Sequence, residues 1–174
     1  MLFRSFRYDP NCLLHGVFMS NLKDGRLRLA RLLSGFIEAK DVRVAASGGV
    51  KFDRVDPTGD AKKGFGHVPF HRVEYTSDKI CAYFNLDLSR LRSYGLTKQA
   101  QDFLILLSVF KVQRFLTEGM RLRTACDFQP IGPVRVVPNG FSWPDSTSLA
   151  SALSEKLAEC SKANLFAQPA VTVV

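Results

Sequence analysis

Several side chains between Ser47 and Arg72 could do chemistry on a phosphodiester. Three aspartates lie close together in this segment, and Mg²⁺ binds carboxylate oxygens of this kind: Asp53, Asp56 and Asp60. Two histidines follow, His67 and His71, and with a neighbouring lysine they could act as acid and base without a metal. Either set would suit cleavage of RNA.

Turn chemistry explains the same aspartates without catalysis. Asp56-Pro57-Thr58-Gly59-Asp60 is ordinary turn sequence. No set of nucleophile, base and orienting group can be assembled from the chain. We therefore expect no catalytic residue, no bound metal and no other cofactor, with an endoribonuclease as the alternative.

The same segment has the composition of a nucleic-acid-binding loop. Its glycines and prolines exclude a regular helix or a central strand. Cations and flat rings suit phosphates and base faces. The candidate RNA-binding residues here are Lys51, Arg54, Lys62, Lys63, Phe65, His67, His71 and Arg72. The alternative is a long surface loop whose phenylalanines fasten it to the core.

Composition agrees with a polyanionic partner. The 174 residues contain 24 Lys and Arg against 16 Asp and Glu, a net charge of +8. Such a surplus favours nucleic acid. With 46% hydrophobic residues the chain has enough apolar side chains for a core in a single domain, residues 1–174. We expect no membrane span and no signal peptide, and scattered, reduced, buried cysteines, hence a cytoplasmic protein.

Hydrophobic patterns predict the elements that must position these residues. We expect a buried strand over residues 13–20, with His15 in the core, and a helix or strand with a basic, solvated face over 26–46. Residues 73–88 read as two β segments, with a core face in the second at Ile80, Ala82, Phe84 and Leu86.

The second half of the sequence predicts two helices and a basic strand. A helix should begin at Thr97 and end at Gly119, packed across a sheet. The strand after it places Arg121 and Arg123 on one face, either as a cationic patch or as salt-bridged surface arginines. A short strand is expected within residues 130–139. A last helix, from Asp145 or Ser146 to Lys162, leads to a tail, together residues 139–174.

This order of elements predicts an α+β fold. A strand, a long β pair, a helix and a strand form half of a split βαβ, or ferredoxin-like, unit. RNA-recognition domains use this topology with RNA on the sheet or its insertions. The usual aromatic RNA-binding signature is missing, so the sheet is not an obvious stacking platform.

Longer strings carry a more specific resemblance. Through about residues 2–128 the chain resembles the backbone RAMP subunit of type I-U (also called I-G) CRISPR effector complexes, in LLHGVFMS, RLARLLSGFIEAKDVRVAASGGVKFDRVDPTGDAKKGFGHVPFHRVEYT, KICAYFNLDLSRLRSYGL and LRTACDF. Family members are considerably longer, so we expect this chain to correspond to their C-terminal part or to a shortened form. A defective remnant is a further alternative.

The resemblance implies a partial, modified ferredoxin-like (RRM-type) RAMP palm with a long inserted β-hairpin or loop, the thumb, at residues 47–72. It implies a non-catalytic subunit of a Cascade-type antiviral complex that assembles along guide RNA (crRNA). Its partners would be crRNA, target nucleic acid through the assembled complex, copies of itself and other effector subunits. Arg121 and Arg123 would lie on the adjoining palm strand.

Overall fold

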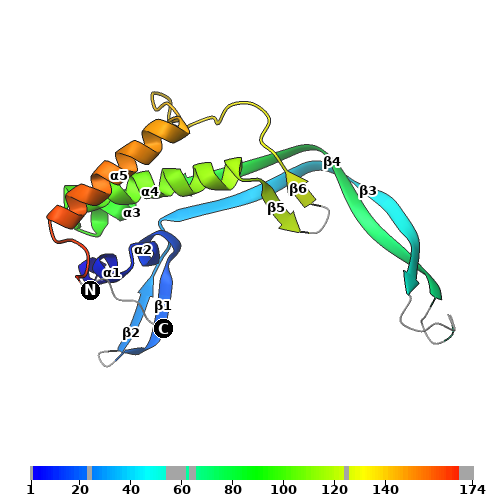
Figure 1. Cartoon of the computed structure of the whole chain (residues 1–174), viewed down its shortest axis with the longest axis horizontal. Coiled ribbons are helices and arrows are strands. Elements are labelled where there is room, and N and C mark those ends of the chain that lie inside the picture. The colour runs from blue at the N-terminus through cyan, green and yellow to red at the C-terminus, as the bar shows by residue number, and fades with distance from the viewer. Residues whose placement is uncertain (1, 23–24, 54–61, 63–65, 124–125, 169–174) are drawn as a thin grey trace. The chain divides into compact units, whose positions relative to one another are not determined.

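The computed structural model divides the chain into two units. It describes residues 2–22, 25–53, 62, 66–123 and 126–168. One unit, here called the compact unit, comprises Met1–Gly35 and Phe84–Val174; the other, Phe36–Tyr83, is here called the ribbon. Both are drawn in Figure 1. Each is described by itself below.

The fold is mixed α+β, as predicted, with small antiparallel sheets that are compatible with a ferredoxin-like palm. The described elements run α1 (Leu2–Tyr8), α2 (Asn11–His15), β1 (Val17–Leu22), β2 (Gly25–Leu29), β3 (Leu33–Asp53), β4 (Gly66–Leu86), α3 (Leu88–Ser93), α4 (Lys98–Thr117), β5 (Met120–Arg123), β6 (Cys126–Phe128) and α5 (Ser146–Lys162). The strands pair two by two, β1 with β2, β3 with β4, and β5 with β6.

Helices build the core of the compact unit. The buried cluster draws residues from α1 to α4, from α5 and from the segments beside them: Phe6, Leu13, Leu14, Leu32, Leu91, Leu96, Ala100, Phe103, Leu104, Cys160 and Leu165. Three phenylalanine rings meet within it. Phe6 stacks on Phe166 at 5.6 Å between ring centres, and Phe103 meets both rings edge-on at 6.0 and 5.5 Å. Burial of these side chains supplies the main stabilising free energy of this unit.

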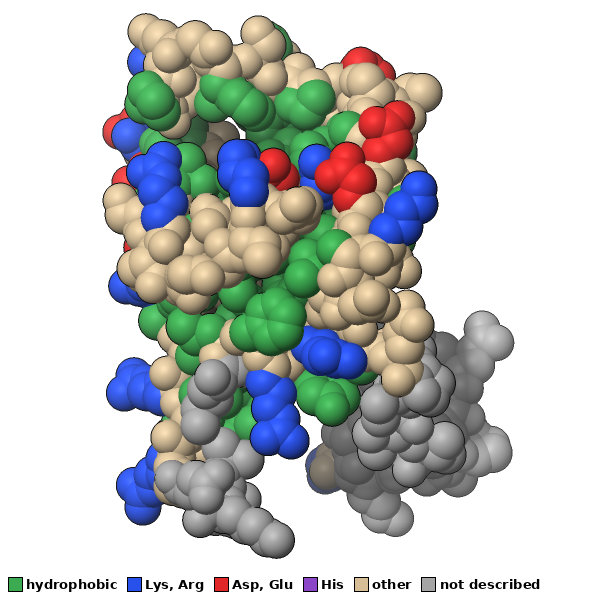
Figure 2. Space-filling model, turned by 90° about the vertical axis from the view of Figure 1, so that its left-hand side faces the viewer, with side chains coloured by type: hydrophobic (Ala, Val, Ile, Leu, Met, Phe, Trp, Pro, Cys, Tyr) green, Lys and Arg blue, Asp and Glu red, His purple; other side chains and the backbone are tan. Residues whose placement is uncertain are grey.

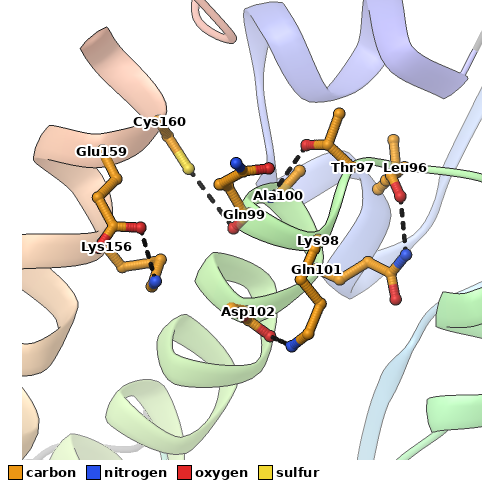
Figure 3. Close-up of polar contacts among 10 residues, drawn as sticks. All are labelled: Leu96, Thr97, Lys98, Gln99, Ala100, Gln101, Asp102, Lys156, Glu159 and Cys160. Atoms are coloured by element: carbon orange, nitrogen blue, oxygen red, sulfur yellow. Dashed lines mark hydrogen bonds and ion pairs between the residues drawn. The ribbon is translucent and has the colours of Figure 1, made fainter. Parts of the chain in front are cut away.

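Helix α4 begins where the sequence predicts. The Thr97 hydroxyl accepts a hydrogen bond from the Ala100 backbone N–H at 3.3 Å, so it caps the first turn. Gly119, at φ +91°, follows the end of the helix. Among the described residues, α4 packs closely on α5, not across a sheet as predicted. Figure 3 shows one such contact, from the Cys160 thiol to the Gln99 carbonyl at 3.6 Å.

Helix α5 also confirms its predicted start and end. The Asp145 carboxylate accepts hydrogen bonds from the backbone N–H groups of Thr147 and Ser148, both at 3.0 Å. These bonds and the Ser148 hydroxyl lower the pKa of Asp145. Leu149 and Cys160 are the buried residues of this helix, whereas Leu157 is exposed.

Two predictions about strands were wrong, and of the two alternatives for residues 26–46 the strand was right. Residues 13–15 belong to α2, so the strand starts at Val17, and His15 is exposed instead of lying in the core. Residues 26–46 are strand throughout except for a short break before Leu33. Residues 130–139 contain no strand. A short apolar run fits a helix or a strand equally well, and long-range pairing decided between them.

The predicted core face of β4 was also wrong. Ile80, Ala82 and Phe84 are exposed, and Leu86 is partly buried. Alternation reports which side chains share a face but not whether another layer covers that face. All four cysteines are free thiols; Cys160 is buried as predicted, whereas Cys12, Cys81 and Cys126 are partly exposed, so their predicted burial was wrong.

Candidate nucleic-acid interface

The ribbon is a long antiparallel pair made from all but the first residues of β3 and the last residues of β4. Contacts join the early part of β3 to the late part of β4: the Phe36 and Tyr83 rings stack at 4.8 Å, and Ser77 donates a hydrogen bond to the Lys40 carbonyl at 2.5 Å. Each full strand has 21 residues. In the fold drawing the pair runs side by side through most of its length (Figure 1).

Glycines in β3 let an aromatic ring lie against the backbone. A Cβ atom on Gly48 would come within 2.9 Å of the Phe70 carbonyl oxygen, and one on Gly49 within 3.2 Å of the Phe70 ring. Neither position has room for a side chain without a shift of Phe70. The Gly48-Gly49 pair therefore positions Phe70, whose ring remains half exposed.

Apolar side chains on the ribbon are widely exposed. The large ones above one-third exposure are Phe36, Val42, Val44, Phe70, Val73, Tyr75, Ile80 and Tyr83. A two-stranded ribbon has no second layer in which to bury them. A run of exposed rings and β-branched side chains of this extent is typical of a surface that meets a partner.

Most cations on the described ribbon already have an acidic neighbour. Arg43 bonds to Asp78 at 2.7 Å, Arg72 lies 3.4 Å from Glu74, and Lys40 lies 3.6 Å from Glu38. All six side chains are solvent-exposed, so these pairs are weak and can rearrange toward a phosphate.

The predicted site residues fall into three groups. His71 and Arg72 lie exposed on β4, Arg121 lies exposed on β5, and Lys62 is an exposed residue between the two long strands. Lys51, His67 and Arg123 lie on strands, but their side chains are outside the described part. Arg54, Lys63 and Phe65 lie outside the described residues altogether, as do Asp56 and Asp60 of the alternative nuclease reading.

Arg121 is a salt-bridged surface arginine, one of the two expectations for it. It faces Asp127 across the β5–β6 pair, with 3.8 Å between Arg121 Nε and the Asp127 carboxylate. Both lie beside Glu118 in the lining of a hollow of about 340 Å³. Two carboxylates next to one arginine make this hollow a poor place for a phosphate.

The net positive charge is concentrated outside the ribbon. Residues 36–83 contain eight Lys and Arg and seven Asp and Glu, a net +1. The remaining 16 Lys and Arg and nine Asp and Glu, a net +7, belong to the compact unit. Figure 2 shows a face of the molecule on which Lys and Arg side chains are spread widely, while Asp and Glu lie mainly in its upper part.

Sequence reasoning missed a second basic region, in the compact unit. It noted the arginines of residues 26–46 and read them as a solvated face. Arg28 and Arg31 are exposed, as that interpretation requires, and they also border a hollow together with Arg90, which is distant in sequence. The signal was the Arg-x-Arg-x-x-Arg spacing from Arg26 to Arg31, but only the fold brings Arg90 to it.

The described part of the chain offers neither a cluster of metal ligands nor a helix that could cross a membrane. No group of three or more His, Cys, Asp or Glu side chains there could hold a metal ion. None of the helices in that part is long and apolar enough to cross a bilayer.

These features define a mixed α+β protein with a small helical core and a long, exposed β-ribbon. Residues 2–44 match the family described as CRISPR-associated protein GSU0053. The matched part runs from α1 into β3 and covers about a quarter of the chain. No curated protein matches the chain. The match supports a CRISPR-associated protein with a role in CRISPR defence.

Proposed function

We propose that this protein is a non-catalytic, cytoplasmic subunit that binds guide RNA in a type I CRISPR effector complex. It assembles along the crRNA beside copies of itself and other effector subunits, and it meets target nucleic acid through the assembled complex. The family match at residues 2–44 supports the CRISPR setting. The resemblance to type I-U backbone subunits supports the finer role.

The observation that carries the proposal is the exposed ribbon. Phe70, His71 and Arg72 are consecutive exposed residues of β4, so an aromatic ring, an imidazole and a guanidinium occur on one short stretch. Tyr75 and Lys79 continue the same strand, and both are exposed. Rings that stack on bases, next to cations that contact phosphates, form a surface that binds single strands with little sequence preference.

RNA binding by the full chain tests the proposal. Fluorescence anisotropy with labelled single-stranded RNA should show tight binding that grows with RNA length and weakens steeply as salt is raised. The double variant Lys62→Glu/Lys63→Glu should lose about tenfold or more in affinity, because four units of charge change at the ribbon. Circular dichroism should show that this variant stays folded.

A matched charge change elsewhere makes the test specific. Lys156→Glu/Lys162→Glu alters the net charge equally on α5 and should reduce RNA affinity much less. Equal losses in both double variants would reduce the effect to general electrostatics and refute the assignment of the ribbon.

A cleavage assay decides between the binding protein and the endoribonuclease. The same RNA, incubated with protein in Mg²⁺ or in chelator, should remain intact in both. Cleavage that disappears in Asp53→Ala or His71→Ala would replace the proposed role with a catalytic one.

A further inference from the structure

A hollow of about 540 Å³ in the compact unit is lined mainly by polar and basic groups. It lies where the end of α2, the paired strands β1 and β2, and α3 come together. Its lining consists of His15, Gly16, Val17, Phe18, Arg28, Leu29, Ala30, Arg31 and Arg90. None of these described lining residues is acidic.

Hydrogen bonds fix the segment that forms one wall. The Leu32 N–H donates to the carbonyls of Leu13 and Leu14 at 3.2 and 3.0 Å, and the Asp87 N–H donates to the Leu32 carbonyl at 2.9 Å. The Tyr94 hydroxyl donates to the Ala30 carbonyl at 3.0 Å. Residues 30–32 are therefore held by three separate parts of the chain.

A close backbone approach at Gly16 completes this wall. Gly16 has φ +79°, and a Cβ atom there would lie 2.8 Å from the Leu29 carbonyl oxygen and 3.1 Å from the Arg31 nitrogen. No other residue fits between the backbone segments without moving them. The shape of the hollow thus depends on glycine at this position.

The hollow's cations are largely available to an anion. Arg90 is oriented by the Arg31 carbonyl at 3.4 Å and by Asp87 at 3.6 Å. The side chains of Arg28 and Arg31 make no hydrogen bond or ion pair with any residue that the structure describes. A guanidinium presents a planar fork that matches two phosphate oxygens.

One lining residue, His15, lies next to a further cation, Lys111. His15 Nε2 lies 2.9 Å from the Lys111 ammonium nitrogen. Partial burial of the ring, with a smaller contribution from Lys111, lowers the pKa of His15. The neutral ring can accept a hydrogen bond from the Lys111 ammonium, so a further cation lies next to one of the lining residues.

An aromatic ring stands beside these cations. Phe18 pairs with Arg28 in the antiparallel register of β1 and β2, so both side chains lie on the same face. The Phe18 side chain is 63% exposed although it lines the hollow. An exposed ring next to open guanidinium groups offers stacking to a base whose phosphate the arginines hold.

We propose that this hollow binds one nucleotide, with its phosphate between Arg28, Arg31 and Arg90 and its base against Phe18. The exposed ring favours a nucleotide over inorganic phosphate or a carboxylate, which would leave Phe18 unused. The site belongs to the compact unit and does not depend on RNA binding by the ribbon. Its nucleotide is either free in solution or part of an RNA strand.

Calorimetric titration of the full chain tests the site with three probes: AMP, adenosine and inorganic phosphate. AMP should bind at least tenfold more tightly than either of the others, because it alone makes both contacts. Arg28→Glu/Arg31→Glu should weaken AMP binding at least tenfold. Phe18→Ala should weaken AMP binding severalfold and leave phosphate binding unchanged.

The double variant Arg4→Glu/Arg92→Glu is the matched control. It makes the same charge change on exposed arginines outside the hollow and should keep AMP affinity within about twofold. Thermal unfolding of each variant shows whether it is folded. Equal AMP affinity in Arg28→Glu/Arg31→Glu and the wild type, or AMP binding no tighter than phosphate, overturns the proposal.

A competition experiment separates the two sources of the nucleotide. If AMP displaces labelled single-stranded RNA in proportion to its occupancy, the hollow holds a nucleotide of the strand. If saturating AMP leaves RNA bound, the hollow holds a free nucleotide. In both cases AMP binds in the hollow, as proposed. Loss of RNA binding in Lys62→Glu/Lys63→Glu with AMP affinity intact shows that the ribbon and the hollow act separately.

Discussion

The compact unit and the ribbon use similar residues in opposite ways. In the compact unit, phenylalanines are buried against one another, as at Phe6 and Phe103. In the ribbon, Phe36 and Tyr83 stack on each other and stay exposed. The difference shows that aromatic side chains form a core in one region and stay exposed to solvent in the other, where the proposed function places them in contact with RNA.

The two regions also differ in net charge. The ribbon is nearly neutral at +1 and pairs most of its described cations, whereas the compact unit holds +7 and leaves arginines such as Arg28 and Arg31 open. Long-range attraction of a polyanion follows net charge. In the proposed RNA complex, the compact unit would therefore supply most of that attraction, and the ribbon would supply stacking and local contacts.

The largest difference between the two regions is expected in the unfolding free energy that is lost when an apolar side chain is truncated to alanine. Leu104→Ala removes a fully buried side chain of α4 and should cost about 2–5 kcal/mol of unfolding free energy. Val44→Ala, at a 70% exposed position of β3, should cost about 1 kcal/mol or less. Urea denaturation measures both. A similar cost at Val44 would mean that the ribbon packs against a layer in solution.

The next largest loss of stability is expected when a glycine in the wall of the hollow is replaced. Gly16→Ala combines a positive φ with a clash against the Leu29 carbonyl and should cost about 2–4 kcal/mol. Gly95→Ala is the control, because Gly95 also has a positive φ, +63°, but open space around it, and should cost about 1 kcal/mol. Equal costs in thermal unfolding would show that the close approach is absent in solution.

The smallest difference in stability cost is expected between the loss of a helix cap in the compact unit and the loss of an ion pair in the ribbon. Thr97→Ala removes the cap of α4 in the compact unit and should cost about 1 kcal/mol. Asp78→Ala removes the exposed partner of Arg43 in the ribbon and should cost less than about 0.5 kcal/mol, falling further in high salt. Chemical denaturation at low and high salt compares the two. A larger loss for Asp78 would show that the pair organises the ribbon.

Local signals predicted the helices of the compact unit well. The Thr97 and Asp145 caps act on backbone groups within three residues, so sequence alone places the starts of α4 and α5. The predictions for Ile80 and His15 were wrong because burial depends on which elements pack nearby. A period-two pattern in β4 is the same whether or not a second layer covers it.

The candidate site shows the same division. The cation- and ring-rich character of β4 near His71 and Arg72 is readable along the chain. The salt bridge of Arg121 with Asp127 was one of two alternatives until strand pairing placed the carboxylate opposite. Arg90 could not be linked to Arg28 from sequence, because no local rule connects residues 62 positions apart.

Sequence by itself determined the positive charge, the helix caps, the α+β class and a glycine-rich segment unsuited to a central strand. It did so because these follow from side-chain type and from neighbours within a few residues. Tertiary structure decided that β3 and β4 form a ribbon with its apolar side chains exposed, and that three arginines and Phe18 surround one hollow. Those outcomes depend on contacts between distant segments, and such contacts exist only once the chain has folded.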